Sequence, residues 1–216
     1  MRHAVIQEDL DHILSHTQGL WEELRGGRVF ITGGTGFFGY WLLESFVAAN
    51  ERLKLGAKAV VLSRNPDAFA RKCPYLAEDP AIEWVRGDVR SFEFPNGDFS
   101  HVIHAAAEVS AVPDENAALA MFDTIVEGTR RTLDFAEKRG VKKFLLTSSG
   151  AVYGKQPPEI THITEDYIGA PDPLDPRSAY GEGKRAAELL CALYSKRHGI
   201  QTKIARCFVF VGPRLP

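Results

Sequence analysis

The chain has 216 residues, of which 44% are hydrophobic, and this is enough to bury the core of one domain. Its formal net charge is −2 with dispersed charges, which argues against a nucleic-acid partner, because no basic stripe is present to attract phosphate backbones. No apolar run is long enough to span a bilayer, so no membrane partner is expected.

The N-terminus and the cysteines bear on the cellular compartment. The first residues mix histidines and carboxylates with apolar side chains and match neither a signal peptide nor a transit peptide, so we expect a cytoplasmic protein. Cys73, Cys191 and Cys207 form no C-x-x-C pair, which favours reduced thiols over a disulfide framework or a zinc site. His101 and His104 lack a third ligand at a suitable spacing, so no metal is expected.

Apolar strands alternate with helical stretches along the chain. Residues 1–26 come first as a helical extension, and residues 27–216 form one domain. Within it we predict strands at 28–32, 59–63, 82–87, 101–105, 143–148 and 202–208, and helices at 36–50, 66–72, 115–139 and 178–198. This alternation predicts an α/β fold of the Rossmann type, a doubly wound parallel sheet with helices on both faces. The proline-rich segment 156–177 is expected to be a long surface loop.

The first strand runs directly into a glycine-rich turn, Gly33, Gly36 and Gly39, with the spacing G-x-x-G-x-x-G. Gly33 would permit the tight turn, Gly36 would let the backbone approach phosphates, and Gly39 would let the helix pack closely on the strand. The positive end of the following helix would then face negative charge. Glycine-rich turns also occur in loops that bind nothing, but in this context the turn predicts a site for a dinucleotide pyrophosphate.

Three further side chains suggest acid–base chemistry. Tyr180 and Lys184 lie four residues apart near the start of a predicted helix, hence on one face, and a neighbouring ammonium group favours the phenolate. Ser149 follows an apolar strand at the edge where open α/β sheets bind ligands. Taken singly, Tyr180 and Lys184 are also typical of solvent-exposed side chains on a helix surface, and Ser149 is typical of a turn. Their order after the glycine turn argues for one shared site.

Together these motifs resemble the extended short-chain dehydrogenase/reductases, the epimerase/dehydratase family of nucleotide-sugar enzymes. The stretches Gly87-Asp88-Val89 and Gly212-Pro213-Arg214 support the resemblance. It implies that Ser149, Tyr180 and Lys184 are catalytic and that residues 27–216 bind NAD(P). The implied cofactor-binding residues are Gly33, Thr35, Gly36, Phe37, Phe38, Gly39, Ser63, Arg64, Asp88, Val89, Ala105, Ala106, Ala107, Thr147, Tyr180, Lys184 and Phe208.

The chain also departs from the family pattern. Ser63 and Arg64 end the second strand where NAD-preferring relatives carry an aspartate for the ribose hydroxyls, and Arg64 would suit a 2′-phosphate. We therefore expect NADP, with NAD as the alternative. Gly150 and Ala151 stand where 4,6-dehydratases place acidic residues, which disfavours that reaction.

Other departures concern the substrate. Ile125, Val209 and Val211 replace polar family residues, and relatives continue for roughly a hundred further residues that supply most of the substrate domain. The chain is therefore expected to be a fragment or a truncated product.

The function expected from these residues is hydride transfer at a carbon of a nucleotide sugar, as a 4-epimerase or a 4-ketosugar reductase. Two alternatives stay open: a non-catalytic NADP-binding module or remnant, and a reductase of a non-sugar carbonyl compound. The expected partners are a nucleotide-sugar substrate and a second copy of the chain, because the two long helices form a dimer contact in relatives.

Overall fold

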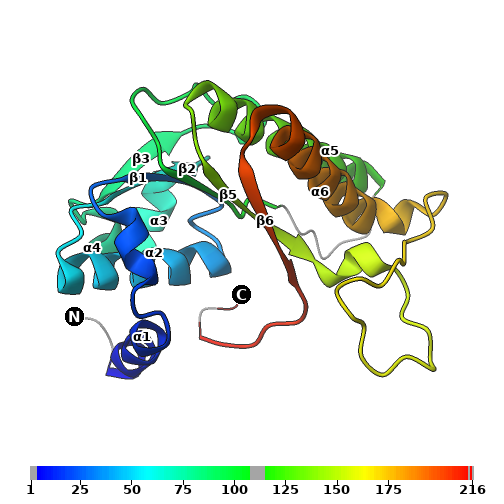
Figure 1. Ribbon diagram of the computed structural model, residues 1–216, viewed down its shortest axis with the longest axis horizontal. Helices are drawn as coiled ribbons and strands as arrows, with labels where there is room; N and C mark the ends of the chain where they lie inside the picture. Colours follow the sequence, from blue (N-terminus) through cyan, green and yellow to red (C-terminus); the bar gives the residue numbers. More distant parts are fainter. Residues whose placement is uncertain (1–3, 108–114, 214, 216) are drawn as a thin grey trace.

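In the described residues one sheet of six strands forms the centre, and every pair of neighbouring strands is parallel (Figure 1). The computed structural model of the protein describes residues 4–107, 115–213 and 215. The strands lie in the order β3-β2-β1-β4-β5-β6. Their bounds are β1 (Arg28–Thr32), β2 (Lys58–Ser63), β3 (Ile82–Arg86), β4 (His101–His104), β5 (Lys143–Ser149) and β6 (Gln201–Cys207).

Helices cover both faces of this sheet, so the predicted Rossmann-type fold is confirmed (Figure 1). One face carries α2, α3 and α4, and the other carries α5 and α6, which lie side by side. The bounds of the α-helices are α1 (Ala4–His16), α2 (Phe37–Leu53), α3 (Pro66–Lys72), α4 (Pro74–Ala77), α5 (Glu115–Lys138) and α6 (Ala179–His198). Short 3-10 helices are η1 (Leu20–Leu24), η2 (Gly150–Tyr153) and η3 (Pro176–Ser178).

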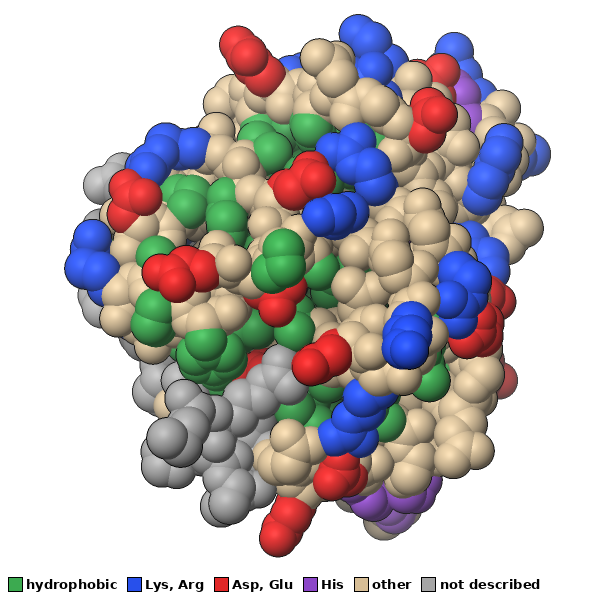
Figure 2. Space-filling view, turned by 90° about the vertical axis from the view of Figure 1, so that its left-hand side faces the viewer, with side chains coloured by type: hydrophobic (Ala, Val, Ile, Leu, Met, Phe, Trp, Pro, Cys, Tyr) green, Lys and Arg blue, Asp and Glu red, His purple; other side chains and the backbone are tan. Residues whose placement is uncertain are grey.

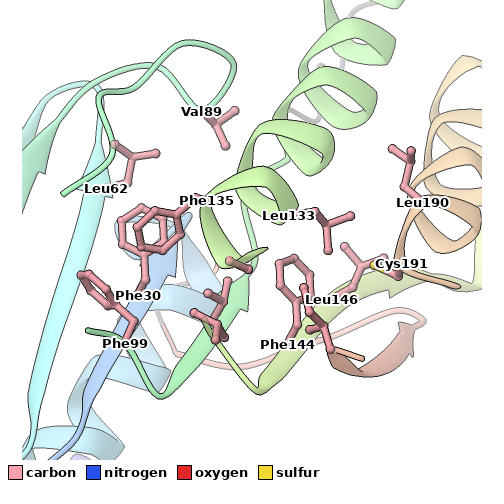
Figure 3. Packing of buried hydrophobic residues seen from close by; sticks show 14 of the residues in the cluster. Phe30, Leu62, Val89, Phe99, Leu133, Phe135, Phe144, Leu146, Leu190 and Cys191 are labelled. Atoms are coloured by element: carbon pink, nitrogen blue, oxygen red, sulfur yellow. The ribbon is translucent and has the colours of Figure 1, made fainter. Parts of the chain in front are cut away.

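Alternation along β1 divides the hydrophobic core into two layers. Phe30 faces the helices α5 and α6, whereas Val29 and Ile31 face α2, because successive side chains of a strand point to opposite faces. The ring of Phe135 on α5 lies 4.4 Å from that of Phe30 and 5.0 Å from that of Phe99, between centroids (Figure 3). These rings fix α5 on the sheet.

The N-terminal segment packs against the opposite layer. Leu10 of α1 is fully buried and packs with Ala48 of α2. The carboxylate of Glu23 in η1 contacts the ammonium of Lys143 at the start of β5. This segment therefore meets α2 and the amino end of the sheet.

Two local features differ from the prediction. Helix α2 continues to Leu53 and ends where Lys54 adopts a left-handed conformation, with φ of 51°. The short helix α4 was not predicted; it begins at Pro74, because proline cannot continue α3 but fits the first turn of a new helix. Between η2 and η3 the proline-rich loop holds no helix or strand, as expected.

Basic and acidic side chains are interspersed over the face drawn in Figure 2, with small apolar areas between them. Within the part of the chain that the structure describes, no helix is both long and apolar enough to cross a membrane.

The sheet reverses its winding between β1 and β4. Strand β1 connects through α2 to β2 on one side, while β4 pairs with the other edge of β1. Ligands of open α/β sheets bind in the crevice outside the carboxyl ends of the strands at such a point.

Candidate active site

The turn between β1 and α2 leaves almost no free space beneath it. Gly33 has a φ of +73°, and a Cβ there would lie 2.5 Å from the carbonyl of Ala105. A Cβ on Gly39 would lie 2.3 Å from the carbonyl oxygen of Gly33. Both distances exclude a side chain, so the turn requires glycine at these two positions.

Gly36 differs from the other two glycines of the turn. It precedes α2, has an ordinary φ of −84°, and provides no side-chain cap for the first turn of the helix. A Cβ on Gly36 would meet only the Gly33 oxygen at 3.5 Å, an ordinary contact distance. The open backbone at the N-terminus of α2 is an arrangement that suits a phosphate group.

Two cavities flank this turn and share Gly33, Gly36, Ala105 and Ala107. The β2 cavity is lined by Thr32, Gly33, Thr35, Gly36, Leu62, Ser63, Arg64, Gly87, Asp88, Val89, Ala105, Ala106, Ala107 and Thr124. The β5 cavity is lined by Gly33, Gly36, Phe37, Phe38, Ala105, Ala107, Thr147, Ser148, Ser149, Tyr180, Lys184, Cys207, Phe208, Phe210 and Leu215. Every predicted site residue except Gly39 lines one cavity or the other. Gly39 lies beneath the turn.

The three predicted catalytic side chains meet in the β5 cavity. Lys184 is 2% exposed, and its ammonium donates a hydrogen bond of 2.8 Å to the carbonyl of Thr147. Burial lowers the pKa of Lys184 to about 8. The ammonium nitrogen lies 5.9 Å from the centroid of the Tyr180 ring, and Ser149 Oγ accepts a hydrogen bond of 3.1 Å from the Ala151 amide.

A buried histidine, His104, lies behind Thr32, which lines the β2 cavity. His104 Nδ1 lies 2.7 Å from Thr32 Oγ1, and its Nε2 lies 3.0 Å from Thr129 Oγ1. Thr129 donates to the carbonyl of Ile125, so its hydroxyl accepts from Nε2–H, and Thr32 in turn donates to Nδ1. Thr32 also accepts the Ala106 amide at 3.2 Å. Both ring nitrogens are thus occupied, and burial lowers the pKa of His104 to about 3.

The β2 cavity contains the polar ends of β2 and β3. Ser63 is buried and its Oγ accepts the amide of Asn65 at 3.2 Å. Asp88 accepts two hydrogen bonds from the guanidinium of Arg90, at 2.9 and 3.0 Å, which hold the pKa of the Asp88 carboxyl below its usual range. Arg64 is exposed at the cavity wall.

Some lining residues were missed by the sequence analysis. Phe210 contacts Phe38 edge to face, with centroids 4.8 Å apart, and Cys207 lines the same cavity. Trp41 Nε1 donates to the Pro213 carbonyl at 3.2 Å, so the segment after β6 crosses the start of α2. The prediction at Phe208 points to this segment, but only its path back toward α2 reveals Phe210. Arg214 lies outside the described residues.

In the part of the chain that the structure describes, no group of three or more His, Cys, Asp or Glu side chains could hold a metal ion.

Residues 29–216 match the model of the NAD-dependent epimerase/dehydratase family. The chain belongs to this family. Among its relatives, UDP-glucuronic acid decarboxylase 6 of Arabidopsis thaliana is 33% identical over 188 residues, 87% of this chain and 52% of the relative. UDP-glucuronic acid decarboxylase 1 of Xenopus tropicalis is 30% identical over 188 residues, 87% of this chain and 42% of the relative.

Two solved structures illustrate the shared fold. A UDP-galactose 4-epimerase is 27% identical with a TM-score of 0.67, covering 87% of this chain and 58% of its own. A short-chain dehydrogenase/reductase superfamily protein from Agrobacterium tumefaciens, solved with bound NAD, is 28% identical with a TM-score of 0.61, covering 83% and 48%. The chain spans about half the length of the curated relatives it matches.

The glycine-rich turn between β1 and α2 offers a matched pair of variants. Gly39→Ala should destabilise the fold by about 1–3 kcal/mol, because its Cβ would press against the Gly33 backbone. Gly36→Ala should change stability by less than about 0.5 kcal/mol and weaken dinucleotide binding, because its methyl group enters both cavities. Urea denaturation and a dinucleotide titration measure the two effects. Equal stability of the two variants would contradict the role of Gly39.

Burial of Lys184 predicts a pH-dependent stability difference. Its pKa is about 8 in the folded protein against an ordinary 10.5, so the unfolded chain binds more protons and stability rises with pH between these values. Lys184→Met should therefore be more stable than the natural protein at pH 7, by about 2 kcal/mol after loss of the hydrogen bond to Thr147.

This gain should shrink as pH rises from 8 to 10.5, which denaturation midpoints of both proteins would show. Lys142→Met, at an exposed position, serves as the control and should show no such pH-dependent difference. A constant gain for Lys184→Met across this range would argue against a charged, buried ammonium group.

Proposed function

We propose that this protein transfers hydride at a carbon of a nucleotide sugar, as a 4-epimerase or a 4-ketosugar reductase that uses a nicotinamide dinucleotide. The observation that carries the proposal is the convergence of Ser149, Tyr180 and Lys184 on one cavity that continues past the glycine turn. Membership of the epimerase/dehydratase family and the names of its relatives support a nucleotide-sugar substrate.

The residues around the turn fit a dinucleotide. The pyrophosphate would lie over Gly36 and the open N-terminus of α2, adenine near Asp88, and the nicotinamide in the β5 cavity. The cofactor would accept hydride from a sugar carbon or return it. The related Agrobacterium protein contains NAD; for this chain we propose NADP(H), since Arg64 occupies the end of β2.

The chain's own side chains would move the protons. Tyr180 would take the hydroxyl proton of the sugar during oxidation and return it during reduction. Lys184 would favour the phenolate of Tyr180 by its positive charge and is held in place by the Thr147 carbonyl. Ser149 would donate a hydrogen bond to the reacting oxygen, because its Oγ already accepts from Ala151 and retains its proton.

The wall next to Ser149 disfavours 4,6-dehydration. That reaction needs proton transfer at neighbouring carbons, and Gly150 and Ala151 carry no acidic group. Phe208 occupies the space above Gly150, because a Cβ there would lie 2.6 Å from its ring. A carboxylate at position 150 would therefore have to displace Phe208.

A second candidate reaction is the decarboxylation of a nucleotide-linked uronic acid. It is favoured by the names of the relatives, several of which are UDP-glucuronic acid decarboxylases. Oxidation at C4 of a uronic acid makes the carboxylate β to a ketone. The C5–C6 bond can then break, with release of CO2 and the electron pair taken up by the ketone oxygen. A proton then adds at C5, and hydride returns to C4. Because Gly150 and Ala151 carry no acidic group, the proton added at C5 would have to come from solvent.

Incubation of the chain with UDP-glucose, UDP-glucuronic acid and a 4-ketosugar nucleotide would separate these reactions. A C4 epimer or a reduced sugar supports the first proposal, and CO2 with a pentose product supports the second. Saturable dinucleotide binding with no turnover of any substrate would instead indicate the non-catalytic module.

Tyr180→Phe tests the proposed acid–base group. Turnover should fall by at least about 100-fold, because the phenolic oxygen no longer transfers a proton, while dinucleotide affinity should change by less than about twofold. Tyr167→Phe, on the loop outside the β5 cavity, is the matched control and should keep full turnover. Comparable turnover of the Tyr180 and Tyr167 variants would remove Tyr180 from the mechanism.

We also propose a homodimer formed through α5 and α6. Leu119, Leu189 and Leu193 are 64%, 61% and 54% exposed on these adjacent helices, and Leu189 and Leu193, four residues apart, lie on one face of α6. Leu189→Glu with Leu193→Glu should convert the dimer to a monomer in sedimentation experiments. A natural chain that sediments as a monomer at all concentrations would refute the proposal.

A further inference from the structure

A carboxylate on α6 lies on the same helix face as Tyr180 and Lys184. Glu188 follows Lys184 by four residues, as Lys184 follows Tyr180, and residues at this spacing are neighbours one turn apart. Glu188 does not line the β5 cavity but a separate cavity between α6, β6 and the proline-rich loop. The mechanism proposed above gives this carboxylate no role.

The Glu188 carboxylate binds two strands at once. Its Oε1 accepts a hydrogen bond of 2.5 Å from Ser148 Oγ on β5, and the same oxygen accepts Arg206 Nε of β6 at 3.1 Å. Its Oε2 accepts Arg206 Nη2 at 2.8 Å, so the guanidinium binds both carboxylate oxygens. Ser148 and Arg206 lie opposite each other in the register of β5 and β6. One side chain of α6 therefore connects the ends of two neighbouring strands.

The residues next in sequence to these two contacts belong to the candidate active site. Ser148 precedes Ser149, and both line the β5 cavity. Arg206 precedes Cys207 and Phe208, which line the same cavity. The carboxylate thus joins the helix that carries the proposed acid–base pair to both strand ends that contribute to the cavity wall.

Arg206 extends these contacts to the proline-rich loop. Its Nη1 donates to Tyr153 Oη at 2.8 Å and to the carbonyl of Glu165 at 3.0 Å. The guanidinium carbon lies 4.7 Å from the centroid of the Tyr153 ring, and that ring stacks on Phe208 with centroids 6.2 Å apart. All three nitrogens of the guanidinium donate hydrogen bonds. Arg206 is therefore fixed in one orientation, and it fixes the carboxylate that it binds.

Stability alone gives little reason for an ion pair at this place. The side chains of Glu188 and Arg206 are 13% and 30% exposed, so both charges lose much of their hydration. The attraction between partly buried charges roughly offsets this loss, and an apolar pair of similar volume often stabilises a fold at least as well. Forked hydrogen bonds to one carboxylate do set a direction and a distance. The pair is better suited to holding geometry than to adding stability.

We propose that Glu188 is a positioning residue, which through Ser148 and Arg206 holds α6 at a fixed distance from the ends of β5 and β6. The side chain that depends on this distance is Lys184, because its ammonium on α6 must reach the Thr147 carbonyl on β5. The inference rests on the proposed function only in so far as Lys184 serves the chemistry there.

NMR titration of isotope-labelled lysine side chains tests the proposal without turnover, with Lys184→Met used to assign the resonance. Glu188→Asp keeps the charge, but its side chain is one methylene shorter and cannot reach Ser148 and Arg206 together. Loosening of α6 from β5 should admit water to the ammonium, so the pKa of Lys184 should rise from about 8 toward the ordinary 10.5. Glu182→Asp, a matched change on α6 outside the β5 cavity, should leave that pKa unchanged.

Arg206→Lys is an independent second variant. It keeps the positive charge beside Glu188 but loses the forked hydrogen bonds, so it should also raise the pKa of Lys184. Combined with Glu188→Asp it should raise that pKa no further than the larger single effect, because both changes break one link. Fluorescence titration with NADPH and NADH should show about three- to tenfold weaker binding in each variant, because Lys184 lies in the proposed nicotinamide site.

The outcomes separate this proposal from the proposed function. An unchanged pKa of Lys184 in both variants would overturn the proposal and leave the pair as a stabilising contact. An equal change in Glu182→Asp would also overturn it, because the effect would then not depend on the bridge. If Glu188→Asp does not fold, Arg206→Lys decides in the same way. Binding of neither dinucleotide to the natural chain would overturn the proposed cofactor site, whereas the pKa of Lys184 would still decide the role of Glu188.

Discussion

The carboxyl edge of the sheet depends on how closely the β1–α2 turn approaches the end of β4. Gly33 lies against the backbone of Ala105, and Gly39 lies against Gly33, so three backbone segments meet without side chains between them. This contact brings the start of α2 to the crevice between β1 and β4. The two cavities are the two sides of a single turn, and they share residues for that reason.

Charged groups in the candidate site act in different dielectric surroundings. Lys184 is buried, where desolvation makes its charge costly and its effect on a neighbouring phenol strong. Arg64 is exposed, where a positive charge costs little desolvation energy. Asp88 is already held by Arg90 and adds little net charge of its own to the β2 cavity.

Local sequence patterns predicted the fold well, because the signals for each strand and helix lie in residues that are close together in the sequence. The apolar strands and the glycine turn appear in the sequence with the spacing that the structure shows; the ends of strands and helices shift by a few residues, and the short helix α4 was missed. The cavity walls were harder to predict. Phe210 reaches Phe38 because the segment after β6 folds back over α2. Such contacts arise from tertiary packing, which no spacing within one motif encodes.

The buried, hydrogen-bonded imidazole of His104 makes the stability of the fold depend on pH in the acid range. The unfolded chain takes up a proton on this histidine near pH 6.5, whereas the folded protein resists it down to about pH 3. Stability is therefore lost progressively as pH falls through this interval, since the unfolded state binds the additional proton. Thr32, His104 and Thr129 join β1, β4 and α5 through this one neutral ring. Acidification should accordingly weaken the link between β1, β4 and α5 through a group that takes no part in the proposed chemistry.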